Sequence, residues 1–66
     1  MQVWINGDSH LLSPETTIGQ LLVENRLEDR RVAVELNEEI VPRSLHDSCK
    51  IRHGDRIEIV HAIGGG

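Results

Sequence analysis

The first residues of the chain alternate between apolar and polar side chains on either side of a turn. Residues 2–5 (QVWI) place Val3 and Ile5 on one side, which is the two-residue period of a half-buried strand. Asn and Gly at 6–7 favour a tight hairpin turn, because both residues tolerate positive φ. Residues 10–12 are therefore predicted to return as a second short strand.

The pattern changes to a helical period within residues 16–27. Thr17 and Gln20 have the spacing of a capping box, in which each side chain bonds a free backbone N–H of the first turn. Gly19 lowers the helix propensity, and we interpret it as a point where the helix approaches the sheet closely. Three apolar residues at helical spacing are predicted to face the core: Ile18, Leu21 and Leu22.

The second half of the chain contains two further strand patterns, at residues 31–37 and 56–63. Residues 37–44 turn the chain and begin an irregular segment, after which Leu45 and Ile51 are predicted to enter the core. The last strand follows a turn at Gly54 and Asp55. One face of it carries Ile57, Ile59, His61 and Ile63, and the other carries Glu58, Val60 and Ala62.

This order of elements predicts an α+β fold with one helix across one face of a mixed sheet. If the first and last strands pair in parallel at its centre, the arrangement is the β-grasp, or ubiquitin-like, fold. We expect a single β-grasp domain at residues 1–63, followed by a flexible glycine tail at 64–66.

Composition narrows the function classes. The chain has 66 residues and a net charge of −4, with Trp4 as its one aromatic residue, which argues against a nucleic-acid partner. The single Cys49 cannot form an internal disulfide and suits a reducing compartment. The sequence contains no segment long and apolar enough to span a membrane and no signal peptide, so we expect a cytoplasmic protein with no membrane partner.

Candidate catalytic groups are present without a convincing arrangement. The histidines lack metal-ligand spacing, and Cys49 lacks an assignable base, so we expect no metal site, no bound cofactor and no nucleophile. The chain is therefore interpreted as a protein substrate and not an enzyme. The groups considered are His10, His46, His53, His61 and Cys49, with the carboxylates Glu38, Glu39, Asp47 and Asp55.

The sequence ends in three glycines, for which two interpretations are open. Glycine loses more backbone freedom on ordering than any other residue, and most glycine-rich ends are simply frayed. Alternatively, a tail without side chains can enter a narrow channel and present the carboxylate of Gly66 to another protein's active site.

The segments TTIGQLL, LNEEIVPRS and HGDRIEIVHAIGGG together resemble the ThiS family, the sulfur-carrier proteins of thiamine biosynthesis. The resemblance covers essentially the whole chain. Its most specific part is the joint pattern of Gly54-Asp55, an apolar strand and a final Gly65-Gly66. Two features depart from the usual pattern: Gly64 extends the glycine pair, and His46 lies where an aromatic residue is expected.

The resemblance implies a mechanism centred on Gly66. An E1-like adenylyltransferase of the ThiF type would consume ATP to activate its carboxylate as an acyl adenylate. A sulfur donor such as a cysteine desulfurase would convert the adenylate into a thiocarboxylate, and a ThiG-type thiazole synthase would take the sulfur. Gly64 and Gly65 would thread the tail into the partner's active site.

Two other interpretations remain open from the sequence: the small subunit of molybdopterin synthase, and a ubiquitin-like docking module without sulfur transfer. In each case the partner needs a surface to bind. Strand alternation places Trp4 opposite the core side chains of its strand, and Val60 and Ala62 share that face if the two end strands are neighbours. We therefore predict a partner-docking patch made of Trp4, Val60 and Ala62.

Overall fold

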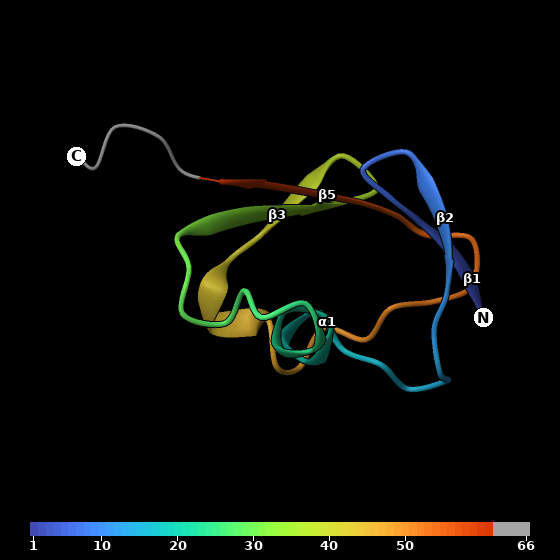
Figure 1. Cartoon of the computed structure of the whole chain (residues 1–66), viewed down its shortest axis with the longest axis horizontal. Helices are drawn as coiled ribbons and strands as arrows, with labels where there is room; N and C mark the ends of the chain where they lie inside the picture. The colour runs from blue at the N-terminus through green and yellow to red at the C-terminus, as the bar shows by residue number, and fades with distance from the viewer. Residues whose placement is uncertain (62–66) are drawn as a thin grey trace.

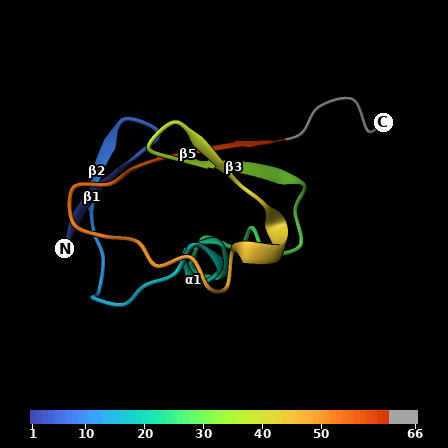
Figure 2. The same cartoon turned by 180° about the vertical axis from the view of Figure 1, so that it is seen from behind.

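Within residues 1–61, five strands form one mixed sheet, and a single α-helix lies across one of its faces (Figures 1 and 2). The computed structural model describes residues 1–61. In chain order the elements are β1 (Gln2–Ile5), β2 (Asp8–Leu11), α1 (Ile18–Glu24), β3 (Val32–Leu36), β4 (Glu39–Val41), a 3-10 turn (Arg43–Leu45) and β5 (Arg56–His61).

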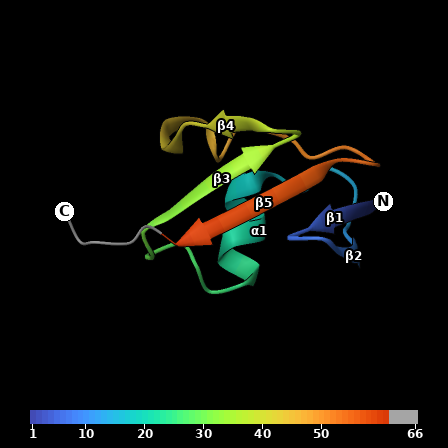
Figure 3. The ribbon, with the colours of Figure 1, turned by 90° about the horizontal axis from the view of Figure 1, so that it is seen from above.

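The strands are arranged in the order β2-β1-β5-β3-β4, so the first and last strands of the chain are neighbours near the centre (Figure 3). β1 and β5 are parallel, whereas the other three neighbouring pairs are antiparallel. The chain passes from β1 to β5 through β2, α1, β3 and β4. The predicted α+β architecture and its parallel central pair are confirmed.

Two tight hairpins build the edges of the sheet. Ile5 pairs with Asp8 across Asn6 and Gly7, whose φ values of 49° and 86° fit the predicted turn. A second hairpin follows β3, where Asn37 and Glu38 have φ values of 51° and 71°.

This second hairpin corrects the prediction of an irregular segment over residues 37–44, because Glu39–Val41 forms β4 beside β3. A glutamate occupies the second turn position, where glycine is the usual signal for a two-residue hairpin. The three-residue strand is also shorter than the window in which alternation can be recognised.

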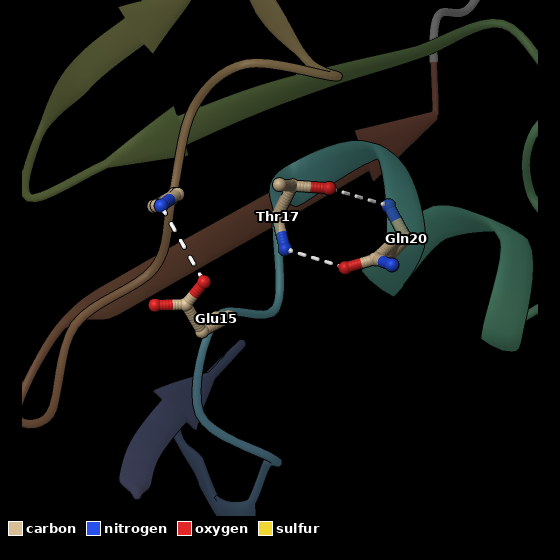
Figure 4. Close-up of polar contacts among 4 residues, drawn as sticks. Glu15, Thr17 and Gln20 are labelled. Atoms are coloured by element: carbon tan, nitrogen blue, oxygen red, sulfur yellow. Dashed lines mark hydrogen bonds and ion pairs between the residues drawn. The ribbon is translucent and has the colours of Figure 1, made fainter.

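The start of α1 is the predicted capping box. The Thr17 hydroxyl accepts from the Gln20 N–H at 3.1 Å, and the Gln20 side chain accepts from the Thr17 N–H at 3.1 Å (Figure 4). Just before it, Glu15 forms an exposed ion pair with Lys50, 3.6 Å apart. Such exposed pairs contribute little stability, so the cap is the main local signal that begins the helix.

The helix ends at Glu24, earlier than the predicted Leu27. Arg26 adopts a left-handed φ of 59°. Its N–H donates to the Val23 carbonyl, and the Leu27 N–H donates to the Leu22 carbonyl at 2.7 Å. These two bonds form a Schellman motif, which satisfies the last carbonyls and turns the chain away. Arginine carries no signal for this conformation, so the sequence does not reveal the stop.

The core lies between α1 and the sheet, and the predicted inward residues of each element contribute to it. Leu45 and His61 are exceptions, since both are exposed, and Ile63 lies outside the described residues. Gly19 was expected to approach the sheet, but a Cβ there would instead overlap the Asp47 carboxylate and lie 3.3 Å from the Asp47 Cα. The buried apolar residues are Val3, Ile18, Leu21, Leu22, Val34, Ile51, Ile57 and Ile59.

Candidate functional site

The face of the sheet that points away from α1, called here the outer face, carries the residues predicted to dock a partner. Trp4 and Val60 both lie on it, with exposed fractions of 38% and 53%. Ala62 and Gly64–Gly66 lie outside the described residues, so the structure places neither the third member of the predicted patch nor the glycines. The docking role of Trp4 and Val60 stays a prediction.

The strand register separates Trp4 from Val60. Trp4 is the partner of Arg56 at the start of β5, whereas Val60 lies four residues further along that strand, about 13 Å away. Arg56 and Glu58 point to the same face between them. The two apolar side chains therefore share a face, as predicted, but are not in one cluster. Val60 has Ala33 of β3 as its cross-strand partner instead.

The outer face has further apolar residues outside the predicted patch. Ile40 is 72% exposed and is the β4 partner of Glu35. Leu11 is 83% exposed and is the β2 partner of Gln2. Ile40 was missed because β4 was not predicted. Exposed apolar side chains therefore lie on both edge strands of the outer face as well as on β1 and β5.

Charged groups occupy the middle of this face. Glu35 and Glu58 are direct cross-strand partners between β3 and β5. Arg56 and Glu58 line a hollow of about 400 Å³ together with Trp4, Gly7 and Gly54. The outer face thus combines an exposed tryptophan, a hollow beside it and a pair of like charges.

The histidines and the cysteine are dispersed over the fold. His46 is 8% exposed, and its Nε2 lies 3.1 Å from the Val41 carbonyl oxygen. The Nδ1 of His53 accepts a hydrogen bond from the Gln2 N–H at 3.0 Å. Cys49 is half-buried against the core. The ring nitrogens of His46 and His53 therefore lie within hydrogen-bond distance of backbone groups of the fold.

His10 and His61 share a second hollow, which lies beneath the sheet next to the end of α1 and is also lined by Asp8. Within residues 1–61, no three His, Cys, Asp or Glu side chains are grouped closely enough to hold a metal ion. None of the helices in that range is long and apolar enough to cross a membrane.

The fold defines the class of protein. A parallel central strand pair, joined through a helix that crosses one sheet face, makes this a small β-grasp domain of the ubiquitin-like class. A sequence profile described as the ThiS family matches residues 3–66. The chain therefore belongs to the ThiS family.

A solved relative supports this assignment in three dimensions. The crystal structure of the thiamine biosynthesis protein (ThiS) from Geobacter metallireducens superposes with a TM-score of 0.87 at 28% identity, and the match covers all of both chains. In sequence, the sulfur carrier protein ThiS of Bacillus subtilis is 42% identical over 50 residues, which are 76% of each chain.

Two larger proteins contain a segment similar to the whole chain. They are the thiazole synthases of Paramagnetospirillum magneticum, at 44% identity, and of Magnetococcus marinus, at 36% identity, each over 66 residues. The chain spans about a fifth of the length of these two synthases, since the match covers 20% of each.

Proposed function

We propose that the chain is a sulfur carrier of thiamine biosynthesis and that Gly66 carries the sulfur. The observation that supports this most directly is the family match over residues 3–66, which includes the final glycines. The similarity to the sulfur carrier protein of Bacillus subtilis supports the same role. The carrier role makes the chain a substrate of partner enzymes, and it requires a free α-carboxylate on Gly66.

The carboxylate of Gly66 must be activated before it can accept sulfur, because a carboxylate is a weak electrophile. A partner adenylyltransferase transfers AMP from ATP to a carboxylate oxygen of Gly66 and releases pyrophosphate. The terminal sulfur of a persulfide, supplied by a donor such as a cysteine desulfurase, attacks the carbonyl carbon and AMP leaves. A thiol then cleaves the sulfur–sulfur bond of the resulting acyl disulfide, which leaves a thiocarboxylate on Gly66 and a disulfide on the donor side.

A thiazole synthase is the proposed acceptor of this sulfur. The segments similar to this chain within two thiazole synthases support that pairing, because in those proteins both parts belong to one polypeptide. The thiocarboxylate sulfur is a strong nucleophile, which suits transfer into a thiazole ring. In the separate proteins, we propose that the outer face binds the partner, with Trp4 as its anchor.

The chain offers a direct test by intact mass spectrometry. Incubation with the adenylyltransferase, ATP, the persulfide donor and a thiol should replace one oxygen of the chain by one sulfur. Omission of ATP should abolish the change, and so should a variant with one residue added after Gly66, since that residue displaces the carboxylate. An unchanged mass with an active partner would refute the carrier function and favour a docking module.

A further inference from the structure

β5 pairs with strands on both sides at its start, but near its end, within residues 1–61, only β3 pairs with it. β3 pairs with β5 as far as His61, through Val32. The register between β1 and β5 covers Arg56 and Ile57. β5 therefore continues past the end of β1 toward the C-terminal end of the chain (Figure 3).

Backbone N–H groups along and just after β1 donate to every second carbonyl from Asp55 onward, which is one residue before β5. The Trp4 N–H donates to the Asp55 carbonyl at 3.0 Å, and the Asn6 N–H donates to the Ile57 carbonyl at 2.9 Å. The next position in this alternation is Ile59. By then the backbone has entered the hairpin turn at Asn6, so β1 supplies no further backbone partner.

The side-chain amide of Asn6 takes the place of that missing backbone. Its Oδ1 accepts from the Ile59 N–H at 2.8 Å, and its Nδ2 donates to the Ile59 carbonyl at 3.2 Å. A carboxamide offers the same donor and acceptor as a peptide group. One side chain thus extends the sheet by one pair of hydrogen bonds along β5, at a residue that is 9% exposed.

We propose that Asn6 is a positioning residue for sulfur transfer. Its amide fixes the backbone of Ile59, two residues before His61, and thereby sets the point and direction from which the residues leading to Gly66 depart. This inference rests on the proposed carrier function, because the direction of β5 matters to the reaction only if Gly66 must reach a partner's active site. Displacements of about 1 Å between reacting groups can cost roughly 100-fold in rate.

The turn also provides a substitution that removes the amide alone. Asn6 has a φ of 49°, a conformation that glycine adopts without strain. Asn6→Gly therefore preserves the turn and deletes both bonds to Ile59. Asn6→Asp is a second variant, since it keeps the acceptor for the Ile59 N–H but directs an oxygen at the Ile59 carbonyl.

Asn37 provides a matched control at the opposite end of β5. It has a φ of 51° in the other hairpin. Its Nδ2 donates to Asp55 Oδ1, and its Oδ1 accepts from the Arg56 N–H, both at 3.0 Å. Asn37→Gly thus removes the same kind of amide and the same number of side-chain hydrogen bonds. The backbone that it releases is at Arg56, five residues before His61.

Three measurements on the full chain test the inference: thermal melts, hydrogen exchange of the Ile59 amide, and ATP–pyrophosphate exchange with the adenylyltransferase. Both glycine variants should melt at similarly lowered temperatures. Asn6→Gly alone should expose the Ile59 amide to faster exchange and lower kcat by about tenfold or more. The KM for the carrier should stay near the parent value, because the outer face is intact. Asn6→Asp should lower kcat in the same direction.

The inference would be overturned if Asn6→Gly had the same kcat as the parent chain. It would also be overturned if Asn6→Gly and Asn37→Gly lowered kcat by the same factor. The carrier function would survive either result, since the parent chain reacts in the same assay. A parent chain that supports no pyrophosphate exchange with an active partner would instead refute the proposed function, and the role of Asn6 with it.

Discussion

The opposed carboxylates of Glu35 and Glu58 make the stability of the fold sensitive to salt. The two residues face each other across β3 and β5 on the outer face. Within residues 1–61, neither takes part in an ion pair. Glu58→Gln removes one of the two charges and keeps the size of the side chain, so it should increase the free energy of unfolding.

The size of this increase follows from the pairing geometry. Side chains directly opposite each other on neighbouring strands are about 4.5–5.5 Å apart at Cβ, and we place their carboxylates about 6 Å apart. Two unit charges about 6 Å apart in water repel by about 0.7 kcal/mol. Screening at physiological ionic strength, where the Debye length is about 8 Å, reduces this value to about 0.3 kcal/mol. We therefore expect Glu58→Gln to stabilise the protein by about 0.3–0.7 kcal/mol, with the larger value at low salt.

Urea denaturation of four proteins measures the effect: the parent, Glu35→Gln, Glu58→Gln and the double variant. The two substitutions should not be additive at low salt, because either one alone relieves the repulsion. At 1 M NaCl the coupling should nearly vanish, since the Debye length falls to about 3 Å. Glu39→Gln is the control, as its cross-strand partner is the apolar Leu36.

Two results would refute this reasoning. One is strict additivity of the two substitutions at low salt, which would show that the carboxylates do not interact. The other is a loss of stability in Glu58→Gln that Glu39→Gln does not share, which would show that Glu58 makes a favourable contact in the fold.

Substitutions at four further positions test other parts of the structure. Trp4→Ala should weaken partner binding by at least about 1 kcal/mol in calorimetry; unchanged affinity in a folded variant would remove Trp4 as an anchor. Cys49→Ser should form the thiocarboxylate at a rate comparable to that of the parent by mass spectrometry, and loss of transfer would assign the thiol a role. Gly65→Ala and then Gly65→Val should reduce pyrophosphate exchange in that order with unchanged melts, whereas parental exchange in both would indicate an idle tail. Gly19→Ala should destabilise by about 1 kcal/mol, because overpacking against Asp47 costs about 1–3 kcal/mol and helix propensity returns up to about 1 kcal/mol; a more stable variant would contradict the close contact.

The sequence alone determined the features that depend on neighbouring residues. The alternation at Val3 and Ile5 identified β1, and Asn6-Gly7 identified its turn, because side-chain direction and φ preference are local properties. The capping box at Thr17 is equally local, since both of its bonds lie within four residues. Family membership likewise followed from motifs that can be read along the chain, and the profile match agrees with them.

The tertiary structure decided where segments distant in sequence meet. The register of β1 on β5 separates Trp4 from Val60, and no local pattern specifies how far one strand slides along another. Gly19 was predicted to lie against the sheet, but it lies against Asp47, 28 residues later in the chain. The sequence predicts Asn6 only as a turn residue, but its side-chain amide is hydrogen-bonded to the backbone of Ile59, 53 residues away. Local rules predict a residue's conformation where its side chain has a strong preference, as at Asn6 and Gly7. Its distant partners depend on the packing of the whole chain, and the two bonds of Asn6 exist only after β1 and β5 are side by side.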